Sequence, residues 1–446
     1  MNWLILVITV ISVYSQAILN FIEQDPNRSH LQQVRNSNHR IDLSNDNSLL
    51  NLLSPSSIET FISGSGLSPS HPYKCEILPG STDYNDVTCE FTFEETSFFN
   101  DLTIGNHSLR TLHKNLIEIP SISGKELSVA LYLKQVLLAM GLHVHLQKVE
   151  NNRFNVYGFK GKFSNKKKIF LTSHIDTVPP YIPYSVHDDK IYGRGSCDAK
   201  ASVVTQIFAY LDMANSLDDD DVALLYVVGE EVDGSGMDKV SLDLNIEMDV
   251  VIFGEPTELK LGKGHKGNYM FDLTVNGKAS HSGYPELGIS ASEILIPVLN
   301  ELLQLDLPKS EILGPSTLNI GQFEGGVAAN VIPANASASI FIRVSEDIDT
   351  IDKKVKNIVS NVDHLSFNLK QTIQPQYLDY DIPGFDTIIL AYATDIPHLT
   401  LPVRKRYLYG PGSIHVAHSD NEYVEYQDLL DAVDGYKRLI THILNN

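Results

Sequence analysis

The chain has few cysteines and few basic residues, and each shortage argues against a class of protein. Only 3 cysteines occur in 446 residues, so cysteine-rich ligation of a structural zinc ion is disfavoured. Lysine and arginine total 34 against 55 aspartates and glutamates, which gives a formal net charge of −21. Phosphate binding needs a basic patch, and we therefore expect no nucleic-acid partner. Hydrophobic residues make up 43% of the chain, enough for a sizeable core and two domains.

Long apolar runs are also lacking, except at the N-terminus. Residues 2–14 read NWLILVITVISVY, which is too short to span a bilayer comfortably. Val13 and Ser15 are small enough for cleavage after Ser15, so we interpret residues 1–15 as a signal peptide, with an uncleaved anchor as the weaker alternative. No later segment is apolar enough for a stable membrane span. We expect a secreted protein, with the vacuolar or lysosomal lumen as the alternative.

Residues 16–107 differ in composition and periodicity from the rest of the chain. They are rich in serine and asparagine and lack regular periodicity, which indicates an N-terminal extension that could be a pro-segment. Cys75 and Cys89 lie within it and could pair in an oxidising compartment. Cys197 is left over, either as a buried unreactive thiol or as a ligand. A secreted glycoprotein would fit the sequons at Asn27, Asn106 and Asn335.

From residue 108 the sequence has the pattern of an α/β protein. Two amphipathic helices are predicted before residue 141, and a further helix over 201–213. Three apolar runs, KKIFLTSHID, VALLYVVGEE and DVVIFGEPT, read as strands that end in carboxylate or imidazole groups. This pattern is typical of an α/β sheet whose site lies at the carboxyl ends of its strands.

Residues 267–373 follow a different order, strand–helix–strand–strand–helix. Alternating segments such as GNYMFDLTVNGKAS and the amphipathic SASEILIPVLNELLQL predict a small inserted α+β domain. The chain then returns to the first domain and closes with a helix over 425–444. The predicted catalytic domain therefore comprises residues 108–266 and 374–446.

Chemistry-bearing residues follow the predicted strands. His174 offers an imidazole nitrogen to a metal, and Asp176, two residues on, could hold the other ring N–H. Asp198 follows a glycine-rich turn in YGRGSCDAK. Its carboxylate could bind cations, or Asp198 could equally be an ordinary helix N-cap. Glu230 and Glu231 end one strand, and on their own they could be solvated glutamates.

Further candidates occupy three other segments. Glu255 ends another strand in GEPT, and a Gly/Pro loop carries two imidazoles, His415 and His418. The inserted domain contributes ASHSG with His281, followed by Asn330 and Arg343. Singly, each is more often a turn or surface feature. Jointly, two histidines and three acidic residues suit two zinc ions that share one carboxylate, and cobalt or manganese would also be accepted.

The motifs SHIDTVP, GRGSCDAK, GEE, GEPT, ASHSG and GPGSIHVAHSDNEYV, in this order, resemble those of the co-catalytic dinuclear zinc metallopeptidase and acylase family. That family includes acetylornithine deacetylase, succinyl-diaminopimelate desuccinylase, glutamate carboxypeptidase and aminoacylase. The resemblance covers residues 108–446. It implies a zinc-binding α/β domain interrupted by a smaller α+β domain that serves as a lid or for dimerisation. Ala201, where the family often has glycine, is a small departure.

The resemblance also implies a role for each candidate. Asp198 would bridge both metals, with His174 and Glu255 completing one site and Glu231 and His418 the other. Glu230 would be the general base, and Asp176 would support His174. His281 would stabilise the oxyanion, with the option of reaching across a homodimer. His418 is preferred over His415 because Ala417-His418 matches the family pattern. The substrate would be bound by Arg343, on a free carboxylate, and by Asn330.

The expected activity is hydrolysis of a peptide or N-acyl amide bond beside a free carboxylate. Because the leader and the extension are unlike the cytosolic biosynthetic members, a carboxypeptidase or N-acyl-amino-acid hydrolase is favoured over an acetylornithine-deacetylase-like deacylase. A non-enzyme alternative is a secreted, inactive binding protein of the same fold. Every expected ligand position is filled, which argues against it. A serine or cysteine hydrolase is disfavoured because no GxSxG motif occurs.

Overall fold

The structure is a computed structural model that describes residues 73–77, 87–91, 105–161 and 166–446. All of these belong to one compact unit, Phe61–Asn446. The expected signal peptide and most of the N-terminal extension lie outside the described residues. Among those described, no helix combines the length and the apolar character that crossing a bilayer requires.

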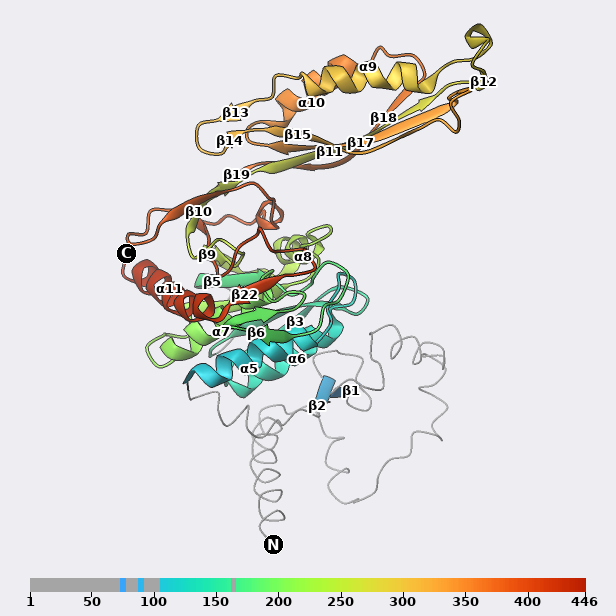
Figure 1. The fold of residues 1–446 in the computed structure, drawn as a ribbon. Coiled ribbons are helices and arrows are strands. Elements are labelled where there is room, and N and C mark those ends of the chain that lie inside the picture. Colours follow the sequence, from blue (N-terminus) through green and yellow to red (C-terminus); the bar gives the residue numbers. More distant parts are fainter. Residues whose placement is uncertain (1–72, 78–86, 92–104, 162–165) are drawn as a thin grey trace, which may run out of the picture. The chain divides into compact units, whose positions relative to one another are not determined.

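The catalytic domain is built on a six-stranded sheet with the order β21-β9-β5-β8-β4-β3 (Figure 1). The four strands β21, β9, β5 and β8 are parallel, and β4 and β3 continue the sheet antiparallel. All six residues of β8 are buried, as expected for a strand covered on both faces. The bounds are β3 His143–Glu150, β4 Arg153–Phe159, β5 Lys166–His174, β8 Val222–Val227, β9 Glu247–Phe253 and β21 Lys405–Leu408.

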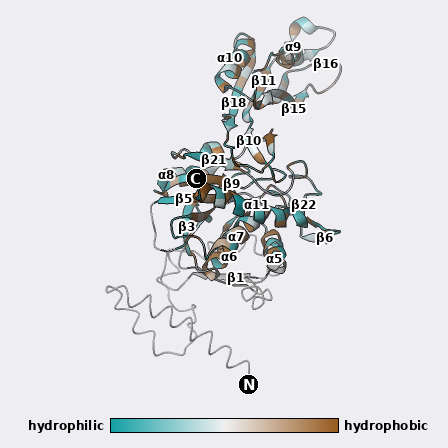
Figure 2. Ribbon diagram, turned by 90° about the vertical axis from the view of Figure 1, so that its left-hand side faces the viewer, coloured by the Kyte–Doolittle hydropathy of each residue, from teal (hydrophilic) through white to brown (hydrophobic). Residues whose placement is uncertain are grey.

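Helices cover both faces of this sheet. One core joins one face of the sheet to α5 Gly105–Glu118, α6 Leu127–Ala139, α7 Lys200–Met213 and α11 Tyr426–Leu444. A second core joins the opposite face to α8 Ser235–Asp243. Figure 2 shows hydrophobic stretches along the ribbon of α6 and α7, two helices that contribute to the first core. This arrangement is the α/β architecture expected from the strand pattern.

The inserted domain is an antiparallel sheet with the order β15-β17-β11-β18, backed on one face by two helices. Along β17 buried residues alternate with more exposed ones, because one face of the sheet packs on the helices. A last strand, β18, follows the second helix and pairs with β11, which the expected element order lacks. The bounds are β11 Gly267–Asn276, α9 Ala291–Leu303, β15 Thr317–Gly325, β17 Asn335–Val344, α10 Ile348–Val359 and β18 Leu365–Ile373.

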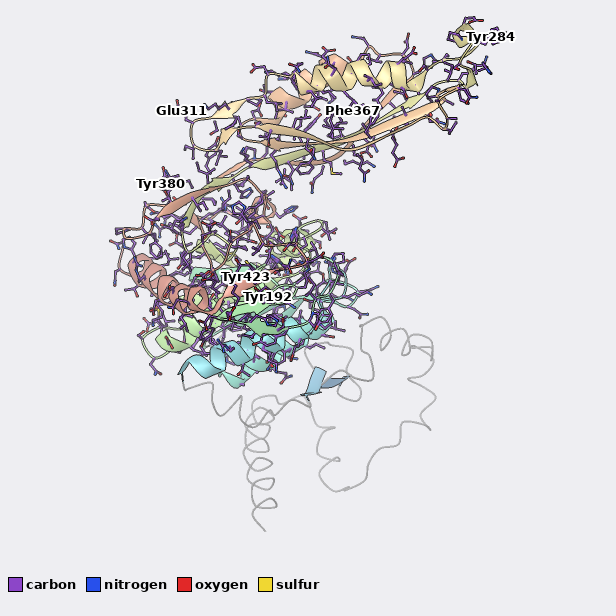
Figure 3. The ribbon with its side chains drawn as sticks, viewed as in Figure 1. Tyr192, Tyr284, Glu311, Phe367, Tyr380 and Tyr423 are labelled. Atoms are coloured by element: carbon purple, nitrogen blue, oxygen red, sulfur yellow. The ribbon has the colours of Figure 1, made fainter. Side chains whose placement is uncertain are left out.

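Short strands complete the fold and bring distant loops together. The sheet β19-β10-β20 lies where the chain enters and leaves the inserted domain, and β22-β7-β6 joins the end of the chain to its middle. Figure 3 shows Tyr192 and Tyr423 side by side on β7 and β22, with ring centroids 5.4 Å apart. The bounds are β6 Ser185–His187, β7 Lys190–Tyr192, β10 Leu261–His265, β12 Ser280–His281, β13 Lys309–Ser310, β14 Gly314–Pro315, β16 Val331–Ile332, β19 Gln376–Tyr377, β20 Thr387–Leu390 and β22 Tyr423–Glu425.

Two strands precede the catalytic domain. They are β1, Tyr73–Ile77, and β2, Val87–Phe91, and they pair antiparallel. In this register Cys75 lies directly opposite Cys89.

Candidate metal centre and active site

The carboxyl ends of three neighbouring parallel strands carry most of the candidate ligands. His174 is the last residue of β5, Glu230 and Glu231 follow β8, and Glu255 follows β9. Because β8 and β9 flank β5 in the sheet, these side chains meet at one edge. Loops bring in the other two ligands, Asp198 from before α7 and His418 from before β22.

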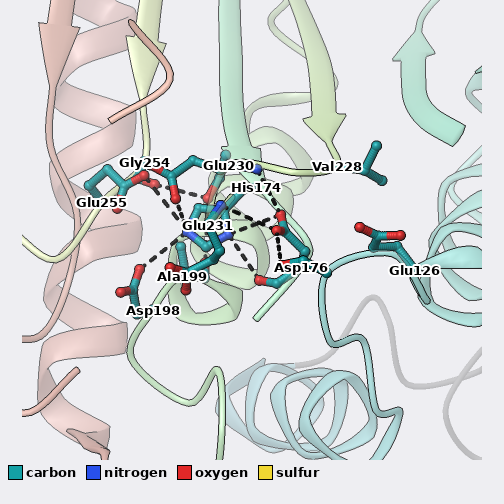
Figure 4. Close-up of polar contacts among 12 residues, drawn as sticks. Glu126, His174, Asp176, Asp198, Ala199, Val228, Glu230, Glu231, Gly254 and Glu255 are labelled. Carbon is teal, nitrogen blue, oxygen red and sulfur yellow. Dashed lines mark hydrogen bonds and ion pairs between the residues drawn. The ribbon is translucent and has the colours of Figure 1, made fainter. Parts of the chain in front are cut away.

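A first group joins His174, Asp198 and Glu255 (Figure 4). The Nε2 atom of His174 lies 3.2 Å from Oδ1 of Asp198 and 3.8 Å from Oε1 of Glu255. Its other nitrogen, Nδ1, lies 3.0 Å from the carbonyl oxygen of Asp176. A carbonyl can only accept, so Nδ1 carries a proton, and Nε2 is the nitrogen that faces the two carboxylates and would bind a metal ion placed between them.

A second group joins Asp198, Glu231 and His418. The Nε2 atom of His418 lies 3.2 Å from Oδ2 of Asp198 and 2.9 Å from Oε2 of Glu231. Asp198 therefore directs one carboxylate oxygen to each group, which is the arrangement of a bridging ligand. His415, the competing imidazole, is exposed and belongs to none of the ligand groups found in the described part of the chain.

Glu230 lies beside both groups. Its Oε2 atom is 3.9 Å from Nε2 of His174, and a third grouping, of His174, Glu230 and Glu231, brings it within ligand distance. Within the described ranges, no side chain donates a hydrogen bond to its carboxylate, whereas Glu231 is engaged by His418. An unengaged carboxylate that faces a cavity is available to take a proton.

The negative charge of the ligand cluster favours the binding of two divalent cations. Burial raises the pKa of Glu230 and of Glu255 well above the usual range, and it raises that of Glu231. Hydrogen bonds with Asp198 and Glu231 raise the pKa of His418 to about 10. Two buried and two partly buried carboxylates lie around two imidazoles, and together they carry more negative charge than such a site tolerates without cations. The nitrogen and oxygen donors therefore fit a dinuclear metal site.

Asp176 supports the cluster differently from the sequence expectation. Its carboxylate oxygen lies 3.6 Å from the His174 ring, farther than its own carbonyl oxygen. Because β5 ends at His174, the side chain of Asp176 no longer follows strand geometry. Instead the carboxylate accepts the backbone N–H groups of Glu230 and Glu231, at 3.2 and 3.3 Å, and the Ser123 hydroxyl at 2.7 Å. Asp176 thus fixes the loop that presents both glutamates.

Glycine at position 229 allows that loop to turn. Gly229 has a φ of +82°, a conformation that side-chain-bearing residues rarely adopt. A Cβ atom there would meet Ser235 Oγ at 2.6 Å and Arg153 Nη2 at 2.7 Å. The turn directs the chain away from β8, so that Glu230 and Glu231 both reach the site.

A cavity of about 450 Å³ opens beside the ligands and extends to the inserted domain. Arg343 lies on its wall, with the guanidinium 4.5 Å from the Phe341 ring and Nη1 bonded at 2.8 Å to Oδ1 of Asn268. Lys370 also lines the cavity but is paired with Asp272 at 3.0 Å. Among the described lysines and arginines of this wall, Arg343 is the one without a carboxylate partner.

His281 and Asn330 lie elsewhere. His281 belongs to β12 and is exposed, and the N–H of Ser282 donates to the carbonyl of Asn330 at 3.0 Å. Neither residue lines the cavity of its own chain. Figure 3 places Tyr284, whose ring is 6.0 Å from that of His281, at an end of the inserted domain. The structure therefore keeps the cavity-lining Arg343 apart from these two candidates.

Cys197 has the surroundings of an unreactive thiol. It is buried, burial raises the pKa of its thiol well above the usual range, and its Sγ lies 3.6 Å from the Ser413 carbonyl oxygen. It belongs to none of the ligand groups in the described residues.

Sequence reasoning missed several residues of this region. Tyr392 and Asp395 line the cavity, and Asp395 is buried. Arg194 and Glu422 form a buried ion pair next to Asp198. Arg194 and Glu422 stand inside the motifs GRGSCDAK and GPGSIHVAHSDNEYV, which was a usable signal. Tyr392 and Asp395 stand in a segment without a comparable pattern.

An α/β sheet whose carboxyl edge carries two overlapping groups of imidazole and carboxylate ligands defines a metal-dependent hydrolase. Comparison with known proteins gives the family. Residues 263–367 match the family model described as a peptidase dimerisation domain. A peptidase M20 domain-containing protein of Schizosaccharomyces pombe is 52% identical over 342 residues, 76% of this chain and 85% of that protein. The chain belongs to the peptidase M20 family, and it is a metallopeptidase.

Other relatives agree with this assignment. A probable carboxypeptidase of Aspergillus flavus is 44% identical over 382 residues, 76% of this chain and 90% of that protein. Among solved structures, a tripeptidase of Staphylococcus aureus has a TM-score of 0.66 at 20% identity, covering 77% of this chain and all of that one. At that identity, the solved structure supports the fold alone.

Proposed function

We propose that the protein is a zinc-dependent exopeptidase of the carboxypeptidase type, which hydrolyses a peptide or N-acyl amide bond beside a free carboxylate. The observation that carries this proposal is the guanidinium of Arg343, which faces the same cavity as the metal ligands and has no carboxylate partner in the described residues. A planar guanidinium binds a carboxylate through two parallel hydrogen bonds. The Aspergillus flavus relative, a probable carboxypeptidase, supports the same substrate class.

The chain's own residues would divide the work as follows. Arg343 binds the free carboxylate and so places the adjacent amide bond over the ligand cluster. Glu230 takes a proton from the attacking water and delivers it to the leaving amine. Asp176 keeps Glu230 in place by accepting its backbone N–H at 3.2 Å. When bound, the metal ions would polarise the scissile carbonyl and lower the pKa of the attacking water.

The ligand groups assign which residues would hold these ions. His174, Asp198 and Glu255 form one set, and Asp198, Glu231 and His418 the other. Imidazole and carboxylate donors suit zinc, and they also accept cobalt and manganese. We expect two equivalents of zinc in protein purified without chelator, and loss of activity in chelator that added zinc restores. Elemental analysis that finds mainly another metal would contradict the zinc assignment.

Changing Arg343 to glutamine tests the substrate class. The variant should lose roughly 10–100-fold in kcat/KM on substrates with a free C-terminal carboxylate, because a charge-assisted pair is replaced by a neutral contact. The same substrates with an amidated C-terminus should be cleaved at nearly wild-type efficiency for that form. Release of the amino acid or its amide from dipeptides and N-acyl amino acids measures both.

Lys370→Gln is the matched control, because Lys370 lines the same cavity but is already paired with Asp272. Its preference for the free acid should stay close to that of the wild type. An Arg343 variant that retained the full preference would exclude Arg343 as the carboxylate ligand.

We also propose secretion, with the vacuolar or lysosomal lumen as the alternative, and glycosylation at the sequons. The apolar residues 2–14 and the Cys75–Cys89 register support this proposal, since directly opposed residues of an antiparallel pair are at disulfide distance. N-terminal sequencing and non-reducing peptide mapping of the mature protein would test it. A free Cys75 thiol and an intact Met1 would contradict it.

A further inference from the structure

A buried ion pair lies directly behind the bridging ligand. Arg194 follows β7, Glu422 precedes β22, and Nη1 of Arg194 lies 2.7 Å from Oε2 of Glu422. Arg194 is 2% exposed and Glu422 is 1% exposed. No role in catalysis or substrate binding accounts for this pair, because neither residue lines the cavity.

Glu422 holds the loop that carries Asp198. Its second carboxylate oxygen, Oε1, accepts the backbone N–H groups of Cys197 and Asp198 at 3.0 and 3.1 Å. Its own carbonyl oxygen accepts the N–H of Gly193 at 3.2 Å and the hydroxyl of Ser196 at 3.3 Å. The position of the Asp198 backbone therefore depends on a residue more than two hundred positions away.

Arg194 holds the loop that carries His418. Its Nη1 also donates to the carbonyl of Ser419 at 3.2 Å, and its Nε to that of Pro180 at 3.2 Å. His418, next to Ser419, has a φ of +62°, a conformation that persists only where its surroundings fix it. The same ion pair thus fixes the backbone beside two ligands of one group.

The other group depends on it less. His174 ends a strand of the central sheet, and Gly254, which precedes Glu255, donates its N–H to the Thr172 carbonyl at 2.7 Å. Two of its three ligands are therefore held by the sheet itself. In the second group, both Asp198 and His418 come from the loops that Arg194 and Glu422 join.

The geometry points to a positioning role: the Arg194–Glu422 pair sets the affinity of the Asp198–Glu231–His418 site for its metal ion, and affects the His174–Asp198–Glu255 site much less. This inference rests on the proposed dinuclear metal site. A pair that served only the fold would lower thermal stability without distinguishing the two sites.

Metal titration of the full chain tests the inference. Metal-free protein is titrated with Zn²⁺ by calorimetry, and the bound equivalents are checked by elemental analysis. The wild type should bind two equivalents. Glu422→Gln should bind one equivalent with nearly unchanged affinity and the second roughly 10–100-fold more weakly, as residues that orient metal ligands commonly do. Glutamine retains an acceptor for the two backbone N–H groups but loses the charge that pairs with Arg194.

Arg194→Lys and Leu439→Ala complete the design. Lysine keeps the positive charge but cannot reach all three acceptors of Arg194, so the second equivalent should again be weakened, even if Glu422→Gln does not fold. Leu439 is buried in α11 and is not part of either loop, so its truncation should lower the melting temperature and keep two equivalents. Equal weakening of both sites, or no weakening, would overturn the inference. A wild type without bound metal would instead overturn the proposed function.

Discussion

Replacing Glu230 by glutamine should abolish turnover and leave both metal ions bound. The loss in kcat expected for removal of a general base is roughly 10²–10⁴-fold. The structure supports this role because the Glu230 carboxylate lies, partly buried, beside the ligand groups, lines the cavity and receives no hydrogen bond from a described side chain. Glutamine has the same shape, so the packing around the cavity should be preserved.

Metal content decides whether Glu230 acts as the base or as a metal ligand. If Glu230 belongs with His174 and Glu231 as a ligand, its replacement will release metal as well as activity. Glu231→Gln is the matched control, because Glu231 is bonded to His418 within the second group and its loss should remove an ion. A Glu230 variant with two bound ions and unchanged kcat would exclude it as the base.

The sequence predicts the sheet and the location of the site because both depend on local pattern. The strand β8 is buried throughout and is followed, after Val228, by Gly229, Glu230 and Glu231, so the strand pattern and the candidate ligands are adjacent in the sequence. The same holds for His174 at the end of β5. Because the carboxyl ends of adjacent parallel strands lie at the same edge of a sheet, these residues come together once the strands are paired.

Contacts between distant loops are not visible in this way. Nothing local marks Glu422 as the partner of Arg194, since the two are 228 positions apart and meet because β22 pairs with β7. The contact between Asp176 and His174 differs in its nearest atom from the prediction for a related reason, since the Asp176 carbonyl oxygen lies closer to the ring than the carboxylate. The prediction assumed that the strand continues, whereas β5 ends at His174 and leaves the Asp176 carboxylate free to hold the next loop.

The inserted domain shows a third limit. Its helices and the strands β11, β15 and β17 are predicted from the sequence pattern, but β18, LSFNLKQTI, is not. This strand lies at one edge of the sheet, and all of its residues are partly or fully exposed although LSFNLK alternates apolar and polar residues, so the segment is not marked as part of a buried face. The position of β18 is fixed by its pairing with β11, and the sequence alone does not reveal this pairing.

His281→Ala should lower kcat by roughly 10²–10³-fold, the usual effect of removing one oxyanion donor. The ring is prepared for donation, because the N–H of Gly283 donates to its Nδ1 at 3.0 Å and the proton must then lie on Nε2. Yet His281 is exposed and does not line the cavity of its own chain. We therefore expect it to complete the site of a second subunit, since residues 263–367 match a peptidase dimerisation domain.

Complementation distinguishes this arrangement from one in which His281 serves its own chain. Glu230→Gln and His281→Ala should each be inactive alone, but a heterodimer of the two contains one site with an intact Glu230 and an intact His281. With random pairing of equal amounts, about one quarter of all sites are active, so the co-expressed mixture should recover about one quarter of the wild-type rate. As a control, protein in which every chain carries His281→Ala and keeps Glu230 should stay inactive. If the first mixture stays inactive although heterodimers form, His281 does not act across the interface.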